Sequence, residues 1–448
     1  MSGFATEQVQ RGYTPGTAQN TVATPIYQTT AYEFASLQDA ADIFALRKFG
    51  NLYSRAANPT QLVFEERVAA LEGGTAAVAV ASGQAAVALA LLALAKSGEH
   101  VVAARQLYGG TVDLLQDTFA DWGIDVDFVD QDDLDAWRDA VRPATRALFA
   151  ESVTNPTAQV LDVRGVAEIA HAAGIPLVID NTVATPYLQR PGEHGADIVV
   201  HSATKYLGGH GTSMGGVIVD LGTFDFGADP ARWPQLTQPY ARIPGVVLWE
   251  RFGASGQALA VLIKTKYVHD LGPSLSPFNA FQLLQGLETL DLRIARHAAS
   301  GLAVARYLEG HPAVSAVHHP GLASSRWADA ARDYLPDGAP AVFSFDLAPA
   351  GDGADADADR ALVHRVVDGL RLVKLVANIG DARSLVAHPA SMTHSHLTAA
   401  QLAEAGISPT TVRLSIGLED PADIIADLAQ ALAAATDALG PQRGEVAR

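Results

Sequence analysis

Two reactive side chains follow neighbouring apolar runs near the middle of the chain. Asp180 follows residues 175–179, and Lys205 comes shortly after residues 196–200. Short apolar runs of this kind are typical of buried strands, so we expect both side chains at strand ends. A lysine amine can form a Schiff base with an aldehyde cofactor, and a carboxylate can keep a pyridine nitrogen protonated. The pair therefore indicates a pyridoxal 5′-phosphate (PLP) site with Lys205 and Asp180 as catalytic residues. The alternatives are a surface lysine and a strand-end cap.

Hydroxyl and backbone groups near this pair suit the phosphate of such a cofactor. Ser202 and Thr204 lie beside the lysine, and Ser82-Gly83-Gln84 joins a predicted strand to a helical segment. The first N–H groups of a helix, together with the helix dipole, bind anions. The same tripeptide would also form an ordinary helix cap. The prediction of phosphate binding therefore depends on the tripeptide and the two hydroxyls together.

Four further polar side chains are candidates for the same site. Tyr108 follows a predicted strand and is expected to stack on the cofactor ring and to move a proton near the leaving group. Tyr53 and Arg55 lie in the first 60 residues, and the arginine could give the phosphate a bidentate contact. Arg413, in a predicted strand, could hold a substrate α-carboxylate with its planar guanidinium. The alternatives are an aromatic at the rim of the core for Tyr108, a solvated side chain for Arg55 and a structural ion pair for Arg413.

A metal site is not expected. His388, His394 and His396 lie close together, but no HExxH pattern and no interleaved carboxylate accompanies them. We expect this segment to be a loop of a second domain that lines a cleft. The chain has no cysteine, which excludes disulfides, a thiolate nucleophile and a cysteine-based metal site.

Apolar runs alternate with helical patterns from residue 61 onward. The expected strands are 76–81, 100–104, 125–129, 146–151, 175–179, 196–200 and 216–220. Helical periodicity covers 83–96, 110–121 and 163–173. This alternation predicts an α/β fold with a mostly parallel seven-stranded sheet and helices on both faces. Ligands of such sheets bind beyond the carboxyl ends of the strands, where Ser82, Glu151, Asp180 and Ser202 fall.

The chain is long enough for two domains and an arm. Residues 1–60 hold few periodic segments and are expected to be an arm that contributes to a neighbouring subunit, so that catalysis would need an oligomer. Residues 61–285 are expected to form the PLP-binding domain. Residues 286–448 are expected to form a smaller α+β domain on the substrate side, with a C-terminal amphipathic helix at 421–439. The acidic segment 351–359 predicts a solvated loop.

Charge and hydropathy limit the partners of the chain. The formal net charge is −18, which argues against nucleic acid and anionic membranes. The longest strongly apolar run, 85–95, is too short to span a bilayer. The first residues lack the basic and apolar regions of a signal peptide, so we expect a cytoplasmic enzyme that acts on small molecules.

The motifs together resemble the Cys/Met-metabolism PLP-dependent enzymes. The resemblance covers nearly the whole chain through YSRAANPT, SGQAA, LYGGT, ESVTNP, DNTVATP, SATKYLGGHG, SPFNAFQLLQGLETL and VRLSIGLED. It implies fold type I and a homotetramer of two tight dimers, with active sites shared across each dimer. It also implies that Asn155 contacts the PLP 3′-oxygen and the substrate, and that Tyr53 and Arg55 bind the phosphate of the neighbouring subunit.

Within this family, the chain looks most like the O-acetylhomoserine sulfhydrylase branch. The supporting features are SGQAA, the insertion at 223–251, SPFNAFQLLQGLETL and NIGDARSL, whose Asn378 joins the predicted substrate-binding residues. The resemblance implies γ-replacement, in which O-acetyl-L-homoserine and sulfide (or methanethiol) give L-homocysteine (or L-methionine) and acetate, a step of methionine biosynthesis. The alternatives are a γ-elimination lyase of the methionine γ-lyase or cystathionine γ-lyase type, cystathionine γ-synthase, and a non-enzymatic regulator with a PLP fold.

Overall fold

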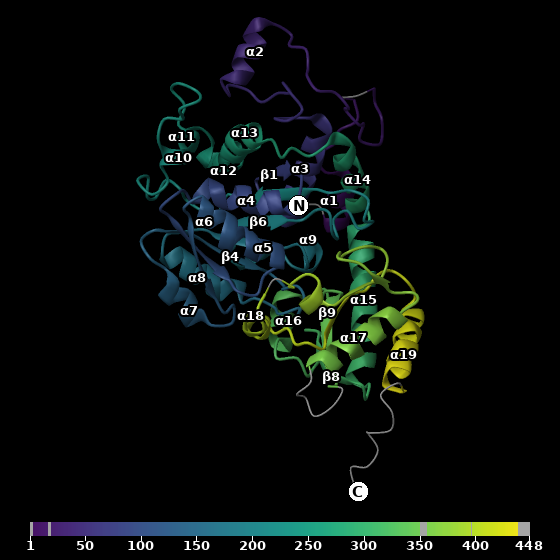
Figure 1. Cartoon of the computed structure of the whole chain (residues 1–448). Coiled ribbons are helices and arrows are strands. Elements are labelled where there is room, and N and C mark those ends of the chain that lie inside the picture. The colour runs from purple at the N-terminus through teal and green to yellow at the C-terminus, as the bar shows by residue number, and fades with distance from the viewer. Residues whose placement is uncertain (1–2, 17–18, 350–355, 396, 438–448) are drawn as a thin grey trace. The chain divides into compact units, whose positions relative to one another are not determined.

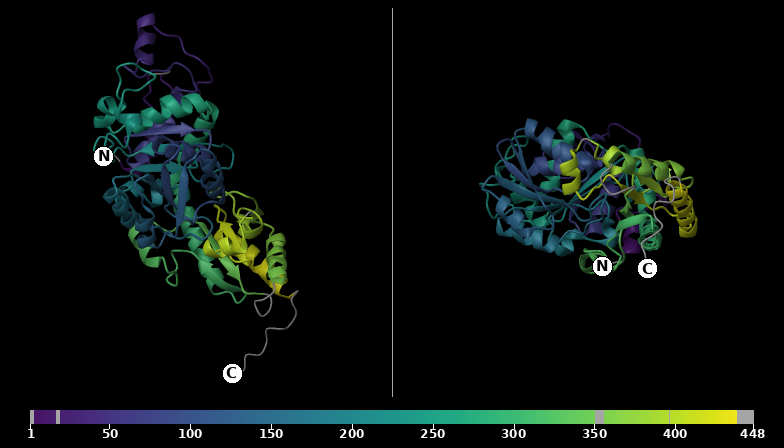
Figure 2. Two further views of the ribbon diagram at one scale, coloured as in Figure 1. Left: turned by 60° about the vertical axis from the view of Figure 1, so that its left-hand side comes forward. Right: turned by 60° about the horizontal axis from the view of Figure 1, so that its bottom comes forward.

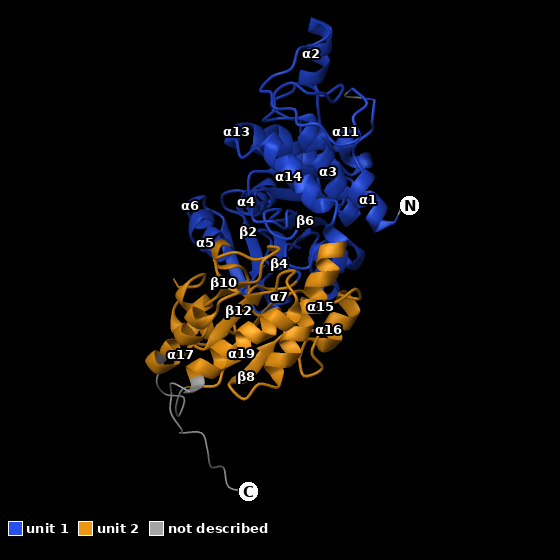
Figure 3. Cartoon of the chain, turned by 90° about the vertical axis from the view of Figure 1, so that its right-hand side faces the viewer, with its two compact units in different colours: residues 1–105, 111–152, 162–291 blue, residues 106–110, 153–161, 292–448 orange. Residues whose placement is uncertain are grey.

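The structure is a computed structural model, and it describes all residues except 1–2, 17–18, 350–355, 396 and 438–448. The chain forms two compact units, coloured separately in Figure 3. The first comprises residues 1–105, 111–152 and 162–291, and the second comprises residues 106–110, 153–161 and 292–448. Two short segments of the N-terminal half, which contain Tyr108 and Asn155, therefore belong to the second unit.

The first unit is built on a seven-stranded sheet, which confirms the predicted architecture. Its strands are β1 (Ala76–Val80), β2 (His100–Ala104), β3 (Asp125–Val129), β4 (Thr145–Glu151), β5 (Leu177–Asp180), β6 (Ile198–His201) and β7 (Gly216–Asp220). Their spatial order is β1-β7-β6-β5-β4-β2-β3. Only β7 runs antiparallel to its neighbours, β1 and β6. The ends of β1, β4, β5 and β6 therefore lie at the same edge of the sheet.

Helices surround this sheet, as Figures 1 and 2 show. The α-helices of the unit are α1 (Phe4–Gln10), α2 (Leu37–Phe44), α3 (Pro59–Glu72), α4 (Gly83–Leu94), α5 (Gly109–Asp113, which begins in the second unit), α6 (Phe119–Asp121), α7 (Leu134–Ala140), α8 (Val163–Ala172), α9 (Thr185–Leu188), α10 (Pro234–Thr237), α11 (Leu248–Phe252), α12 (Ala258–Leu262), α13 (His269–Leu271) and α14 (Pro277–Leu287). The 3₁₀ and π segments are η1 (Leu114–Thr118), η2 (Pro191–His194), η3 (Gly253–Ser255) and η4 (Ile263–Val268). The apolar side chains of β1, β2 and β4–β7 are buried beneath these helices, as continuous apolar runs require.

The first 60 residues are fixed to the start of α3 by one asparagine. Asn58 caps α3 through Oδ1, which accepts from Thr60 N at 2.9 Å, and Pro59 occupies the first helical position. The Nδ2 atom of the same side chain donates to Tyr27 O at 2.8 Å and to Tyr32 Oη at 3.0 Å. Because Asn58 is fully buried, its amide needs these partners, and the segment before α3 supplies them.

The second unit has a five-stranded sheet in the order β10-β11-β12-β9-β8. Its strands are β8 (Val314–His318), β9 (Val342–Leu347), β10 (Lys374–Leu375), β11 (Leu385–Ala387) and β12 (Thr411–Ser415), and only the β10–β11 pair is parallel. Its helices are α15 (Leu290–Glu309, which begins in the first unit), α16 (Ala328–Tyr334), α17 (Ala356–Gly369), α18 (Ala399–Glu404), α19 (Pro421–Asp437) and the 3₁₀ turn η5 (Pro389–Ser391). The mixture of sheet and helices confirms the α+β prediction for this part of the chain.

Several predicted boundaries were wrong in detail. The predicted helix at 110–121 is divided into α5, a π segment and α6. Both β5 and β6 begin two residues later and end one residue later than predicted, so Asp180 is itself the last residue of β5. Residues 356–359 of the expected acidic loop begin α17, because their alanines favour a helix, and the rest of that loop lies outside the described residues. The predicted end of the last helix, 438–439, also lies outside them.

In the part of the chain that the structure describes, no helix is both long and apolar enough to cross a membrane.

Candidate active site

Asp180 lies in the middle of the sheet edge where the strands end. In the strand register it is paired with Glu151 of β4 and with Val200 of β6. Its Oδ1 accepts from Thr182 N at 2.9 Å. Burial raises the pKa of Asp180, although hydrogen bonds from the side chain and backbone of Thr182 and the charge of His201 act in the opposite direction. A cationic partner would stabilise this half-buried carboxylate, because burial of an unpaired charge is costly.

Thr182 connects this carboxylate to the lysine segment. Its Oγ1 accepts from Ser202 N at 2.8 Å, while its own N–H is donated to Asp180. Thr182 is not among the site residues predicted from the sequence. The available signal was the DNT tripeptide, because an aspartate often accepts from the backbone two residues later. The acceptor in the next strand could not be identified from local sequence.

Lys205 lies in a tight turn that follows β6. Its N–H donates to Ser202 O at 3.1 Å, and its carbonyl accepts from Gly209 N at 2.7 Å. The hydroxyl of Thr204 both donates to Gly215 O at 3.2 Å and accepts from Gly215 N at 3.1 Å. The turn is thus fixed by its backbone and by Thr204, and the half-buried lysine comes from a rigid segment.

The start of α4 lies against the same segment. Ser82 is the N-cap of this 12-residue helix, and its Oγ accepts from Ala85 N at 3.2 Å. A Cβ atom built on Gly83 would lie 2.5 Å from the Cβ and 2.9 Å from the Oγ of Ser202. Gln84 accepts through Oε1 from the hydroxyl of Thr111 at 3.2 Å. The helix start and Ser202 are therefore in close contact, as the phosphate prediction requires.

These residues fit PLP on three grounds. The first is the half-buried carboxylate of Asp180, which suits a protonated pyridine nitrogen. The second is the glycine at the start of α4, since a larger side chain would fill the space beside Ser202. The third is the helix start itself, because its first N–H groups have no acceptor inside the helix and bind phosphate well.

Tyr53 and Arg55 contact each other. The guanidinium of Arg55 lies 5.0 Å from the centre of the Tyr53 ring, and Tyr53 is exposed. Neither forms a hydrogen bond to Asp180 or Ser202 among the described residues of this single chain. Within this single chain, the structure therefore does not place Tyr53 and Arg55 in contact with Asp180 or Ser202.

Three predicted substrate-side residues come together in the second unit. Arg413 lies in β12 and is almost fully buried. Its Nη1 donates to Asn155 Oδ1 at 3.4 Å, and its Nη2 donates to the backbone carbonyl of Asn378 at 2.9 Å. The contact of Asn378 with the guanidinium thus uses the main chain rather than the side chain. Tyr108 also belongs to this unit, directly before α5, and is exposed.

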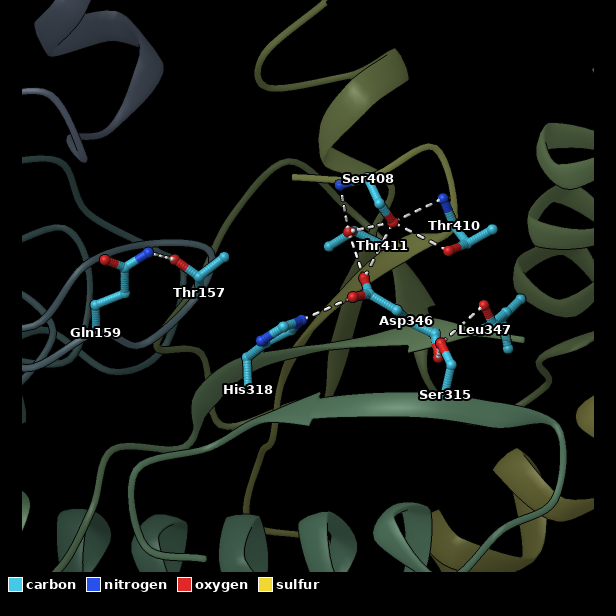
Figure 4. A network of polar contacts seen from close by, with 9 residues as sticks. All are labelled: Thr157, Gln159, Ser315, His318, Asp346, Leu347, Ser408, Thr410 and Thr411. Carbon is cyan, nitrogen blue, oxygen red and sulfur yellow. Dashed lines mark hydrogen bonds and ion pairs between the residues drawn. The ribbon is translucent and has the colours of Figure 1, made fainter. Parts of the chain in front are cut away.

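A polar network fixes the beginning of β12, as Figure 4 shows. Asp346 of β9 lies 2.8 Å from His318 Nε2 and accepts hydrogen bonds from the hydroxyls of Ser408 and Thr411. Burial alone would raise the pKa of Asp346, but His318 and the two hydroxyls outweigh it and the pKa is lowered. Because Arg413 is two residues after Thr411, both side chains lie on the same face of the strand.

The histidine-rich segment is tied to its own surroundings. His388 lies 2.7 Å from Ser391 Oγ and 3.0 Å from Pro409 O, so both ring nitrogens have partners. His394 Nδ1 lies 2.9 Å from Thr393 Oγ1, and His396 lies outside the described residues. Within the described ranges, no group of three or more His, Cys, Asp or Glu side chains is placed to hold a metal ion.

Comparison with known proteins decides the family. Residues 5–433 match the model of the family described as "Cys/Met metabolism PLP-dependent enzyme". This chain belongs to that family. It is a PLP-dependent enzyme of fold type I.

Members of this family with curated names resemble the chain over nearly its whole length. An O-acetyl-L-homoserine sulfhydrylase of Leptospira meyeri is 46% identical, over 94% of each chain. A homocysteine synthase of Schizosaccharomyces pombe is 44% identical, over 96% of this chain and 98% of the relative. A Campylobacter jejuni protein assigned as an O-acetylhomoserine (thiol)-lyase has a crystal structure that superposes with a TM-score of 0.91 at 39% identity. That match covers 96% of this chain and 100% of the other, and that protein contains N′-pyridoxyl-lysine-5′-monophosphate.

Proposed function

We propose that this PLP-dependent enzyme catalyses γ-replacement on O-acetyl-L-homoserine. Sulfide displaces acetate and gives L-homocysteine, and methanethiol in place of sulfide gives L-methionine. The observation that carries the proposal is the half-buried Asp180 on the same sheet edge as Lys205, since the pair suits PLP chemistry. The two curated relatives, named for sulfhydrylation of O-acetylhomoserine and for homocysteine synthesis, support the substrate class and a place in methionine biosynthesis.

Lys205 and Asp180 are the proposed catalytic residues that hold the cofactor ring. When bound, PLP supplies an electron sink for the carbanion that forms at the substrate α-carbon. Lys205 Nζ would hold the cofactor covalently, and its free amine would take and return the substrate α-proton. The carboxylate of Asp180 holds a proton on the pyridine nitrogen, and Thr182 keeps that carboxylate in place.

Phosphate binding is assigned to the start of α4 and the turn after β6. The backbone N–H groups of Gly83 and Gln84 face an anion in the manner of other helix starts, and the hydroxyls of Ser82 and Ser202 add donors. Thr204 belongs to the same group. Its hydroxyl must exchange its bond to Gly215 O for one to phosphate if it contacts the ligand directly.

Substrate recognition is assigned to residues of the second unit. Arg413 holds the α-carboxylate, with Asn155 and the Asn378 carbonyl fixing the orientation of its guanidinium. Asn155 also contacts the cofactor 3′-oxygen and the substrate in this proposal. Tyr108 stacks on the cofactor ring and moves a proton near the departing acetate. Its exposure in the single chain is compatible with a residue that faces a ligand.

The assembly and the domain roles are part of the same proposal. Residues 1–60 reach a neighbouring subunit and place Tyr53 and Arg55 against its phosphate, within a homotetramer of two dimers. Residues 61–285 bind PLP, and residues 286–448 bind the substrate side. The exposed apolar side chains of Leu37, Phe44 and Phe49 support an arm that is covered in an assembly. We also propose a cytoplasmic location, on the basis that the relatives are enzymes of amino-acid metabolism.

Product analysis tests the reaction. Purified holoenzyme is incubated with O-acetyl-L-homoserine in the presence and absence of sulfide, and homocysteine, acetate and keto acid are measured. We expect homocysteine and acetate in equal amounts with sulfide, and little keto acid without it. Equal keto acid production in both samples would reject γ-replacement in favour of γ-elimination. A panel with O-succinyl and O-phospho-homoserine, and with cysteine as the nucleophile, separates the cystathionine γ-synthase alternative.

A further inference from the structure

A buried glutamate contacts residues at the ends of two strands, on the face of the sheet opposite Asp180. Glu72, the last residue of α3, accepts through Oε1 from Asn181 Nδ2 at 2.8 Å, and the same oxygen lies 2.7 Å from His201 Nε2. The side chains of Glu72 and His201 are both fully inaccessible to solvent. An acidic and a basic group without solvent contact are costly to keep, unless each compensates the other. Because this buried pair lies at the sheet edge of the predicted PLP site, it is a candidate to support that site.

The contacts continue directly to the backbone of Asp180. Asn181 Oδ1 accepts from Ser152 Oγ at 2.7 Å, and Ser152 N donates to Asp180 O at 3.0 Å. Asn181 Nδ2 also donates to Gln189 O at 2.9 Å, which fixes the segment that follows. The residues just beyond β4 and β5 and the last residue of β6 are thereby tied to one carboxylate. The carbonyl of Asp180 and the side chain of the next residue, Asn181, are thus both held in place.

The alternation of side chains along the strands explains why the predicted ligand contacts and the supporting contacts lie on opposite faces of the sheet. Successive residues of a strand face opposite sides of the sheet, so Asp180 faces one side while Asn181 faces the other. The alternation likewise separates His201 from Ser202, which contacts Gly83 at the start of α4. The sheet edge therefore has a ligand side with Asp180 and Ser202 and a supporting side with Asn181, His201 and Glu72. Across the sheet, the charge of His201 lowers the pKa of Asp180, against the effect of burial.

We propose that Glu72 and His201 form a positioning couple for the predicted cofactor carboxylate. The couple fixes the strand end that carries Asp180, so that its carboxylate stays directed toward the pyridine nitrogen. This inference rests on the role of Asp180 in the proposed function. Neither Glu72 nor His201 touches the ligand side, so they act only through Asp180.

The test uses holoenzyme and the absorbance of bound PLP as a function of pH, with no substrate present. Glu72→Gln keeps the shape of the side chain and removes its charge. His201→Gln keeps a donor near the position of Nε2 and removes the imidazole. Glu65→Gln is the matched control, because Glu65 lies on the same helix, is buried, and pairs with Lys264 away from Asp180.

We expect both test variants to shift the pH at which the cofactor absorbance changes by about one unit, the size of effect that a nearby charge exerts. We also expect kcat to fall about tenfold with KM within about twofold. The double variant is expected to be no worse than the more damaging single variant, because the two residues act as one unit. Glu65→Gln is expected to lower the unfolding midpoint and to leave the absorbance profile unchanged.

The inference is overturned if His201→Gln folds and binds PLP with an unchanged absorbance profile, or if Glu65→Gln shifts the profile equally. Asp180→Asn separates this failure from that of the proposed function. If Asp180→Asn leaves the profile unchanged, the role of Asp180 itself is wrong. If the wild-type holoenzyme binds PLP but does not convert O-acetyl-L-homoserine, the substrate proposal fails while the couple is still supported by a positive spectral result.

Discussion

Gly83 and Ser202 are so close that a methyl group on Gly83 would lie 2.5 Å from the Cβ of Ser202. The two residues are far apart in sequence, and each follows a strand that ends at the same edge. Their contact brings the start of α4 against the turn that contains Lys205. This is the clearest indication in the fold that the phosphate and Schiff-base predictions describe one site.

Gly83→Ala is expected to weaken PLP binding at least tenfold, because relief of this overlap costs about 1–3 kcal/mol and moves the helix start away from Ser202. Equilibrium binding of PLP to the apoenzyme measures the effect. Gly310→Ala is the control, since the nearest atoms there are 3.8 Å from the added methyl group. Equal affinities for the Gly83 variant and the wild type would show that the start of α4 does not bind the phosphate.

Lys205→Ala is expected to abolish turnover, with a loss of at least about 10⁴-fold because it removes both the covalent link and the base. Non-covalent PLP binding is expected to remain. Borohydride reduction followed by mass spectrometry should place a pyridoxyl group on Lys205 in the wild type and none in the variant. Lys96→Ala, a change of an exposed lysine, serves as the control. Full activity in the Lys205 variant would reject the assigned role.

Arg413→Lys is expected to raise the KM for the amino-acid substrate about tenfold or more, with cofactor content unchanged. Lysine has one point charge and cannot replace a planar group that donates to Asn155 and to the Asn378 carbonyl at the same time. Steady-state kinetics at several substrate concentrations measure the change. Arg383→Lys, at an exposed arginine of the same unit, should leave KM unaltered. An unchanged KM at position 413 would mean that another group holds the carboxylate.

Acid sensitivity is expected from His319, which is fully buried next to Phe343. Burial, with a smaller effect of Arg306, lowers the pKa of His319 to about 4, whereas the unfolded chain has a histidine pKa of about 6.5. The unfolded state therefore binds more protons between these values. The contribution of His319 to the free energy of unfolding is fully present above about pH 6.5. It is lost as the pH decreases toward 4, by up to roughly 3 kcal/mol.

Denaturant unfolding at pH 7.5 and pH 5 measures this contribution. His319→Asn is the comparison, because its side-chain oxygen can still accept from Gly321 N, as Nδ1 does at 3.0 Å. The variant is expected to lose less stability than the wild type over this interval, whatever its stability at pH 7.5. Identical losses in the two proteins would assign the acid sensitivity to other groups.

Much of the first unit could be predicted because its signals are local. Strands β2, β3 and β7 have the predicted bounds, since short apolar runs between helical segments leave few other arrangements. The start of a helix after Ser82 was likewise predicted, and the structure contains it. Boundaries at 110–121 were missed because a π segment has no periodic signature in sequence.

The sequence by itself determined which reactive residue types follow which strands: Asp180 at the end of β5, the Lys205 turn after β6, and a glycine helix start after β1. Only the tertiary structure decided which residues support them. Glu72 and His201 are 129 residues apart, and Thr182 contacts Ser202 across two strand ends. The main-chain contact of Asn378 with Arg413 is of the same kind. Local patterns of hydropathy and turn residues record how each element forms, whereas these contacts depend on strand order, register and the face to which each side chain is directed.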